Sequence, residues 1–420
     1  MSKKKRIVKI SIAAVAAILT LALTLTVITL VRYYSLADTG LPRIEIITEG
    51  NAPIMSKTDY VNCKISVSET DEAFCFEDAD GKIRGRGNNT WVFYPKKPYR
   101  IKFTEKTSMF GETENRSWVL LAMYNDFSYT KDRMAFALAD RLGDDFAPCY
   151  HYVDLYINGE YRGVYLLTDQ VDENEGRTGV QEKIHPNDTE VPFLVEMDAY
   201  GSSEGLDGVH WFGVSGSVYN VKYPDETERY TQEQFEYIRR YIETVDALCR
   251  KPGVTMAELA EYVDMDSFIN YFIVQEVMGQ REINWKSMYM SKSIDGKLKM
   301  GPVWDYDWAA NGPSLGEDSE TWREAYEGFC SETNWFALLY QGSPEFKAAL
   351  QARWSEVRDD VLDVIDEIED EKETLERATE RDHLRWHWYR LGHSYDDYFD
   401  ELIDWMERRI AWLDRELGVE

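Results

Sequence analysis

The stretch YVDLYINGEYRGVYLLTDQV, residues 152–171, reads as two β-strands joined by a tight turn. Asn158-Gly159 is a strong two-residue hairpin signal, and the β-branched and aromatic residues on each side are typical of strands. Similar short runs, broken by Gly, Asn and Asp, extend from Ile44 to about Asp198: RIEIIT, VNCKISV, YRIKF, SWVLLAMY and FLVEMD. This part of the chain is therefore predicted to be rich in strands.

One helix is predicted to interrupt the strands, over DFSYTKDRMAFALADRLG (126–143), with Asp126 or Ser128 as its N-cap and Gly143 as its stop. After residue 198 apolar residues recur at helical spacing, over 231–249, 255–263, 266–279 and almost continuously over 343–417. A hairpin is predicted within this second part, over 287–304, turning at Asp295-Gly296. We predict an α+β fold of two lobes, strand-rich over 44–198 and helical over 199–420, with a ligand site between them.

The N-terminus carries a membrane signal. Residues 1–9 form a basic tail, and residues 10–31 are 22 residues without a charge. As a helix this run would measure about 33 Å, enough to cross a bilayer. Because the basic residues precede the run, the positive-inside rule predicts a single-pass protein of the cell membrane with a cytoplasmic N-terminus, a stalk over 32–43 and an extracytoplasmic domain. A cleaved signal peptide is the competing interpretation.

The predicted exterior part is strongly acidic. Residues 41–420 contain 41 Lys and Arg against 75 Asp and Glu, a net charge of −34. Such a surface repels nucleic acid and anionic lipid, so no nucleic-acid partner is expected. The five cysteines form no CxxC motif, which leaves a zinc knuckle unsupported. Cys63 and Cys75 flank a predicted hairpin and could form a disulfide, or the cysteines could be free buried thiols.

A basic segment stands out against this acidity, KIRGRGNNTWVFYPKKPYRIKF (82–103). Gly85 and Gly87 would let the backbone approach a ligand closely. Positive charge gathers around them at Arg84, Arg86, Lys96, Lys97, Arg100 and Lys102. Strand alternation places Arg100 and Lys102 on one face, where a lysine could hold a phosphate if that face lined the cleft. A turn with solvated basic side chains is the alternative.

Two acidic segments complete the pattern. In REIN (281–284) a carboxylate, Glu282, and a carboxamide, Asn284, could supply a base and an oxygen ligand to a metal, although an exposed polar loop has the same composition. In KMGPVWDYDWAAN (299–311) strand spacing would put Asp305 and Asp307 on one face and the flanking aromatics on the other. A divalent cation would remove the repulsion between the two aspartates, whereas a solvated turn would tolerate it without one.

The order of these segments suits phosphoryl transfer, which needs donors for the phosphates, a base near the attacking hydroxyl and oxygen ligands for magnesium. The standard protein-kinase signatures G-x-G-x-x-G, H-R-D and D-F-G are missing from the sequence.

Several segments, taken together and in order, closely resemble the CotH family of spore-coat-type, kinase-like proteins: RGRGNNTW, KKPYRIKF, SWVLLAMYND, YVDLYINGEYRGVYLLTDQV, YFIVQEV, INWKSMYM and GPVWDYDW. The resemblance covers about residues 44–415. It implies an atypical protein-kinase-like fold that binds ATP with Mg²⁺ and phosphorylates serines of secreted or cell-surface proteins.

The resemblance also implies roles for individual residues. Lys102 resembles the strand lysine that contacts phosphate, with Arg100 beside it, and Arg84, Gly85 and Gly87 resemble the part that folds over the nucleotide. Asp305, Asp307 and Asn284 are similar to the metal ligands, and Glu282 stands at the position of the base.

Many relatives have Asp where this chain has Glu282, and a misplacement of about 1 Å can lower a rate roughly a hundredfold. A kinase-like surface binding protein with weak or no catalytic activity therefore stays an alternative. A kinase that acts on glycan or lipid hydroxyls is a further alternative.

Overall fold

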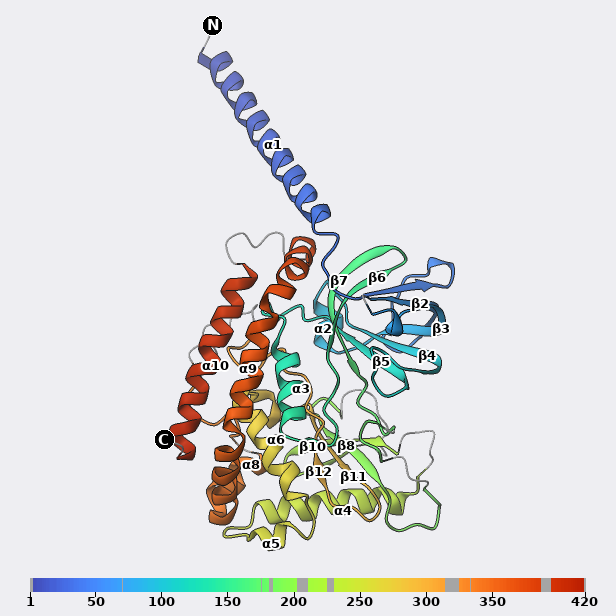
Figure 1. Cartoon of the computed structure of the whole chain (residues 1–420), viewed down its shortest axis with the longest axis vertical. Helices are drawn as coiled ribbons and strands as arrows, with labels where there is room; N and C mark the ends of the chain where they lie inside the picture. Colours follow the sequence, from blue (N-terminus) through green and yellow to red (C-terminus); the bar gives the residue numbers. More distant parts are fainter. Residues whose placement is uncertain are drawn as a thin grey trace.

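The computed structural model describes residues 3–418 except 70, 175, 181–183, 202–210, 225–229, 314–324, 333 and 387–393, and describes side chains from residue 14 onward. Within this range the chain is a mixed α+β structure, in which two β-sheets are followed by a helical C-terminal part. Figure 1 shows a barrel beside the upper part of a long helix, with the second sheet below the barrel.

The first sheet is a closed barrel with the strand order β1-β2-β3-β4-β5-β7-β6. Its strands are β1 Arg43–Thr48, β2 Val61–Ser68, β3 Phe76–Gly85, β4 Tyr99–Thr107, β5 Asn115–Leu121, β6 His151–Ile157 and β7 Glu160–Asp169. Alternate residues of each strand point into the barrel, so Ile83, Ile101 and Trp118 are fully buried. The β6–β7 hairpin turns at Asn158 and Gly159, both at positive φ, which confirms the turn predicted there.

The second sheet has the order β12-β11-β8-β10-β9. Its strands are β8 Phe193–Met197, β9 Trp211–Val214, β10 Ser217–Tyr223, β11 Met288–Lys292 and β12 Lys299–Met300. The predicted hairpin over 287–304 is confirmed as β11 and β12. The strand predicted at FLVEMD is also present as β8, but it lies between β10 and β11 rather than in the barrel.

The helices are α1 Lys3–Ser35, α2 Asn89–Phe93, α3 Lys131–Arg141, α4 Gln232–Cys249, α5 Met256–Leu259, α6 Met265–Val277, α8 Trp335–Gly342, α9 Pro344–Trp386 and α10 Tyr395–Leu417. Short 3₁₀ helices occur at η1 Glu49–Asn51, η2 Glu72–Phe74 and η3 Arg281–Asn284. The segment of Glu282 and Asn284, expected to be a loop, is thus a helical turn. Helix α6 matches the helical spacing predicted over 266–279, and it ends just before Gly279, which has a φ of 57°.

Helix α3 interrupts the strands in sequence but packs against α6 and α9 of the helical part. Its N-cap is Thr130, so the prediction of Asp126 or Ser128 is wrong. The Asp126 carboxylate nevertheless accepts hydrogen bonds from the backbone N–H groups of Ser128 (3.0 Å) and Lys131 (3.1 Å). From its place in a tight turn before the helix, this carboxylate therefore pairs with a backbone N–H of the first helical turn, which has no partner within the helix.

Helix α1 extends away from the body of the protein (Figure 1). Its segment Ala14–Ser35 is 22 residues long with a mean hydropathy of 2.5, and it is long and apolar enough to cross a membrane. A signal sequence has the same properties. All five cysteines are free thiols, so the disulfide considered between Cys63 and Cys75 is not formed.

Candidate functional site

One pocket formed by the described residues has a volume of about 560 Å³. Its walls are the end of the barrel at residues 86–90 and 121–124, the start of α3, strand β8 and the segments 282–289 and 304–308. Its charged lining residues are six carboxylates, Asp132, Glu196, Asp198, Glu282, Asp305 and Asp307, and two cations, Arg86 and Lys286. An excess of carboxylates in a concave site favours a cation as part of what it binds.

Asp305 is held from several sides. Its Oδ2 accepts a hydrogen bond from Ser287 Oγ at 2.9 Å and lies 3.4 Å from Lys286 Nζ. Its backbone carbonyl accepts a hydrogen bond from Gln280 Nε2 at 2.5 Å. Burial raises the pKa of Asp305, but the charge of Lys286, the Ser287 hydroxyl and Arg86 outweigh burial and leave this pKa below its ordinary value. Asp305 is therefore the carboxylate of the site most strongly held in its ionised form.

Glu282 has one occupied and one unoccupied carboxylate oxygen. Its Oε1 lies 2.9 Å from Lys286 Nζ, one turn further along the chain. Its Oε2 is buried and has no hydrogen-bond partner among the residues that the structure describes. Burial and then the neighbouring charge of Asp305 raise the pKa of Glu282 to about 7. A buried acceptor without a donor is costly, so Oε2 is a place where a ligand hydroxyl, water or cation would be stabilised.

Asp307 and Asp132 add to the negative charge. Burial, followed by repulsion from Asp305, Asp132 and Glu282, raises the pKa of Asp307 well above its ordinary value. Asp132, in the first turn of α3, accepts a hydrogen bond from the backbone N–H of Tyr306 at 2.8 Å, and burial raises its pKa to about 7. Helix α3 thus fixes the backbone between the two aspartates of the 305–307 segment.

The strand geometry expected for residues 304–308 is wrong. These residues form no strand, and Asp305 has a φ of 70°. Both aspartates line the pocket, as an alternating strand would require, but Trp304 and Trp308 line it too. Tyr306 alone turns fully into the core, where its hydroxyl accepts a hydrogen bond from Gln275 Nε2 at 2.5 Å. The left-handed residue at 305 breaks the alternation that a strand would impose.

Asn284 is not among the residues that line the pocket. Its side-chain nitrogen donates to the backbone carbonyls of Arg281 (2.9 Å) and Cys330 (2.8 Å). Its side-chain oxygen accepts from the backbone N–H of Glu332 at 3.1 Å. In this arrangement the carboxamide fastens the segment around residues 330–332 to η3.

The two glycines of the basic segment have different surroundings. Gly87, at φ 78°, lines the pocket. Gly85 lies against Trp91, and a Cβ at position 85 would come within 2.3 Å of its ring. Gly85 is therefore required by packing of the barrel end. Arg84 donates to the backbone carbonyl of Lys57 and lies beside the ring of Tyr60, outside the pocket.

Arg100 and Lys102 share one face of β4, as alternation predicted, and neither is among the lining residues. Lys102 follows Pro98 of the pocket rim by four residues, roughly 13 Å along a strand. Cross-strand pairing sets Lys82 opposite Lys102 and Arg84 opposite Arg100. This face of the barrel is therefore a basic strip that starts beside the pocket. Like charges directly opposite each other are unfavourable.

The other basic residues of this segment differ in their burial and in their contacts. Lys96 is fully buried, where its ammonium donates to the carbonyl of Val164 at 2.6 Å and pairs with Asp382 at 2.8 Å. Lys97 donates to the carbonyl of Trp91 at 2.5 Å. Arg86 is the cation of this segment that lines the pocket, with its guanidinium 5.3 Å from the ring of Trp304.

No site role is predicted from the sequence for three residues of the pocket: Lys286, Ser287 and Asp132. The four-residue interval between Glu282 and Lys286, which places two side chains on one face of a helical turn, was the available signal for Lys286. Nothing in the sequence marks Asp132, because its contact with Tyr306 joins residues 174 positions apart.

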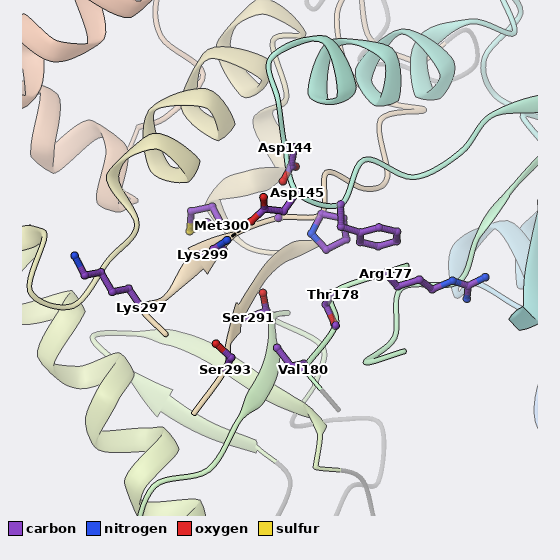
Figure 2. Close-up of a pocket in the computed structure, with 14 residues that line it drawn as sticks. Asp144, Asp145, Arg177, Thr178, Val180, Ser291, Ser293, Lys297, Lys299 and Met300 are labelled. Carbon is purple, nitrogen blue, oxygen red and sulfur yellow. Dashed lines mark hydrogen bonds and ion pairs between the residues drawn. The ribbon is translucent and has the colours of Figure 1, made fainter. Parts of the chain in front are cut away.

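A second pocket, of about 190 Å³, lies beside the β11–β12 hairpin (Figure 2). Figure 2 shows Asp144 and Asp145 above Lys299, while Arg177 points away from the group. Burial raises the pKa of Asp144 to about 7. Its lining holds two carboxylates against the six of the larger pocket, so the larger pocket is the candidate site.

Comparison with protein families matches residues 83–413 to the family described as CotH kinase protein. A search of curated proteins finds no significant match. The matched range contains the whole lining of the larger pocket, from Arg86 to Trp308. Since the match spans well over half of the 420 residues, the chain belongs to the CotH kinase protein family.

Proposed function

We propose that this protein is a membrane-anchored, extracytoplasmic kinase of atypical protein-kinase-like, two-lobed fold. It transfers the γ-phosphate of ATP to Ser or Thr hydroxyls of secreted or cell-surface proteins. The observation that carries the proposal is the unpartnered, buried Oε2 of Glu282 in a pocket shared with Asp305 and Asp307. Family membership supports use of ATP in general.

The carboxylates suit Mg²⁺. Burial, together with repulsion from Asp305, raises the pKa values of Asp307, Asp132 and Glu282, and a divalent cation would relieve this repulsion. Asp305 and Asp307 would hold the ion, and magnesium would neutralise charge on the ATP phosphates. Asn284 remains a proposed third ligand, on the condition that its carboxamide leaves Cys330 and Glu332.

Arg86 and Lys286 are the cations best placed to contact phosphates, because both line the pocket. Gly87 offers a backbone without a side chain at the same edge. Contact with the phosphates stays a prediction for four further residues: Lys102, Arg100, Arg84 and Gly85. Their basic strip could contact an outer part of the bound nucleotide.

In the proposed transfer, Glu282 accepts the proton of the acceptor hydroxyl. The acceptor oxygen forms a bond to the γ-phosphorus as the bond from that phosphorus to the β–γ bridging oxygen breaks, and ADP leaves. Lys286, which contacts both Glu282 and Asp305, keeps the two carboxylates in fixed relation. Positioning and charge stabilisation supply most of the catalysis in this class of reaction.

A kinase-like binding protein without transferase activity is the second candidate. Two observations favour it: Lys286 already pairs with both Glu282 and Asp305, and the Asn284 carboxamide is fully engaged. In that case the pocket would bind a nucleotide or another anion without turnover.

The test uses the full chain in mild detergent with ATP carrying a radiolabelled γ-phosphate, Mg²⁺ and dephosphorylated casein as a generic acceptor. We expect label on serine or threonine, and at least a hundredfold less label with Asp305→Asn. ATP binding with no incorporation in the wild type would favour the binding protein. Label recovered only in a lipid or glycan fraction would replace the protein acceptor.

A further inference from the structure

A second group of metal-type ligands lies on the barrel, apart from the pocket. Among the described residues, Glu112, Cys149 and His151 place one ligand atom each within 4.8 Å of the others. None of the three lines the pocket of Asp305. They combine a carboxylate oxygen, a thiol sulfur and an imidazole nitrogen, the donor types that Zn²⁺ accepts in proteins.

Each ligand stands on backbone that is already fixed. Glu112 follows a tight turn in which its N–H donates to the carbonyl of Met109 (3.0 Å) and its carbonyl accepts from Ser108 Oγ (2.6 Å). The N–H of Cys149 donates to Asp169 Oδ2 at 2.9 Å. Little conformational freedom would be lost on binding a metal, because these turns are ordered without one.

The side chains converge from different elements. Cys149 and His151 are two residues apart at the start of β6, a spacing that puts both on one face of an extended chain. The ring of Phe110 stacks on His151 with a centroid distance of 5.0 Å. His151 Nε2 lies 2.7 Å from Glu112 Oε1, and the Cys149 thiol hydrogen-bonds to the Asp169 carboxylate, so a metal would replace both contacts.

The accessibility of the group also suits a metal. Cys149 is buried, whereas the side chains of His151 and Glu112 are 29% and 38% exposed. An ion can therefore enter from the solvent side, and a water molecule can fill a fourth position. Ligand atoms of a tetrahedral zinc site lie about 3.4–3.8 Å apart, so side-chain rotations would bring the three atoms to this spacing and open the 2.7 Å contact between His151 and Glu112.

We propose that Glu112, Cys149 and His151 form a Zn²⁺ site, with water as the fourth ligand and Asp169 holding the Cys149 backbone from behind. Binding forms a zinc–sulfur bond and releases the thiol proton to solvent. The ion would tie the β4–β5 connection to the start of β6, beside the end of β7, where the chain leaves the barrel. With three protein ligands and one water the site is an open one, and it does not depend on the proposed kinase function.

The experiment replaces zinc with Co²⁺, whose spectrum reports its ligands. The full chain in mild detergent is stripped with a chelator and titrated with Co²⁺ in excess Mg²⁺, which competes for the carboxylate pocket. We expect a thiolate-to-cobalt charge-transfer band in the near ultraviolet and intense visible bands of tetrahedral cobalt, saturating at about one ion per chain. Added Zn²⁺ should abolish both.

Variants locate the ion. Cys149→Ser should lose the charge-transfer band, and His151→Gln should weaken binding by at least about 10–100-fold. Cys75→Ser, which removes the exposed thiol of the same barrel, should leave spectrum and affinity unchanged. A wild-type titration without a sulfur band would overturn the proposal without relying on the folding of any variant. A band that disappears in Cys75→Ser instead would do the same.

Discussion

At the scale of single residues, the pocket concentrates unfavourable features that a ligand would relieve. Asp305 and Ser287 both have positive φ, 70° and 59°, although neither is glycine, and their side chains hydrogen-bond to each other. Non-glycine residues in this region carry a cost of order 1–3 kcal/mol each and gather at functional sites. Glu282 Oε2 adds a buried acceptor without a partner.

The role of Glu282 gives the first prediction. Glu282→Gln keeps the size of the side chain but removes its basicity, so phosphate transfer should fall by about 10²–10⁴ while Mg-ATP binding stays within a few fold. Glu282→Asp keeps the carboxylate on a shorter arm and should retain more activity than Gln. Initial rates and ATP affinity, measured for both variants, check this. Equal rates for Gln and wild type would remove Glu282 from the chemistry.

Asp144, in the smaller pocket of Figure 2, gives a pH prediction. Burial raises its pKa in the folded protein to about 7, above the ordinary carboxyl value in the unfolded chain. The folded state therefore holds an extra proton between about pH 4 and 7, and this residue makes the protein less stable as pH rises through that range. The difference is on the order of 2–4 kcal/mol.

Asp144→Asn should remove this dependence. Its melting temperature should exceed that of the wild type by a few degrees at pH 8 and match it at pH 4 to 5. Asp359→Asn on α9 is the control, because that side chain is 94% exposed and its loss should leave the pH profile of melting unchanged. Parallel profiles for wild type and Asp144→Asn would contradict the argument.

At the scale of elements, helix α9 packs against one side of the barrel, along β7. Asp382 of α9 accepts hydrogen bonds from the backbone N–H of Val164 (2.8 Å) and from the Tyr129 hydroxyl (2.7 Å), and it pairs with Lys96. The approach is close at Gly163, where a Cβ would lie 2.0 Å from the Asp382 carboxylate. One carboxylate thus joins a strand, the turn before α3 and the basic segment.

Removing the Asp382 carboxylate should destabilise the folded protein. Asp382→Ala leaves the Lys96 ammonium buried without its counter-charge, and the expected loss in the free energy of unfolding is about 3–5 kcal/mol. Lys96→Met combined with Asp382→Asn should recover part of this loss, since the amide oxygen keeps an acceptor and no charge remains. Thermal or denaturant unfolding measures both. The exposed Glu373→Ala on the same helix is the control, and an Asp382→Ala variant as stable as this control would refute the prediction.

Most elements follow from local patterns, because the apolar alternation of the strands and the 3.6-residue spacing of the helices lie in the residues themselves. The Asn158-Gly159 turn and the stop of α6 at Gly279 are examples. The pairing of β8 with β10 and β11, and the packing of α3 on α9, depend on contacts between distant segments. Within the pocket, Glu282, Asp305 and Asp307 could be proposed from sequence, whereas the contacts of Lys286 and Asp132 required the fold.

At the scale of the whole molecule, the segment after α1 is fastened to the body. The predicted stalk includes Thr39, which is buried and donates to Asp154 Oδ2 at 2.8 Å. Arg377 and Arg381 of α9 donate to the carbonyls of Asp38 and Ala37. A membrane anchor at α1 would therefore hold the barrel and α9 in a set orientation to the bilayer rather than on a free tether.

The predicted outward topology can be tested with the native cysteines. Cys75 is exposed while the other four thiols are buried. A membrane-impermeant maleimide should therefore label the full chain in intact cells, and Cys75→Ser should abolish that labelling. Labelling that appears only after permeabilisation would place the domain on the cytoplasmic side.

The central claim is that the carboxylates of the larger pocket hold a magnesium-bound nucleotide. Its most direct test is calorimetric titration of the full chain in detergent with ATP, with and without Mg²⁺. The wild type should bind about one ATP per chain only when Mg²⁺ is present, Asp305→Asn should lose at least tenfold in affinity, and the exposed Asp80→Asn should bind as the wild type does. Binding that is indifferent to both Mg²⁺ and Asp305, or no binding at all, would contradict the claim.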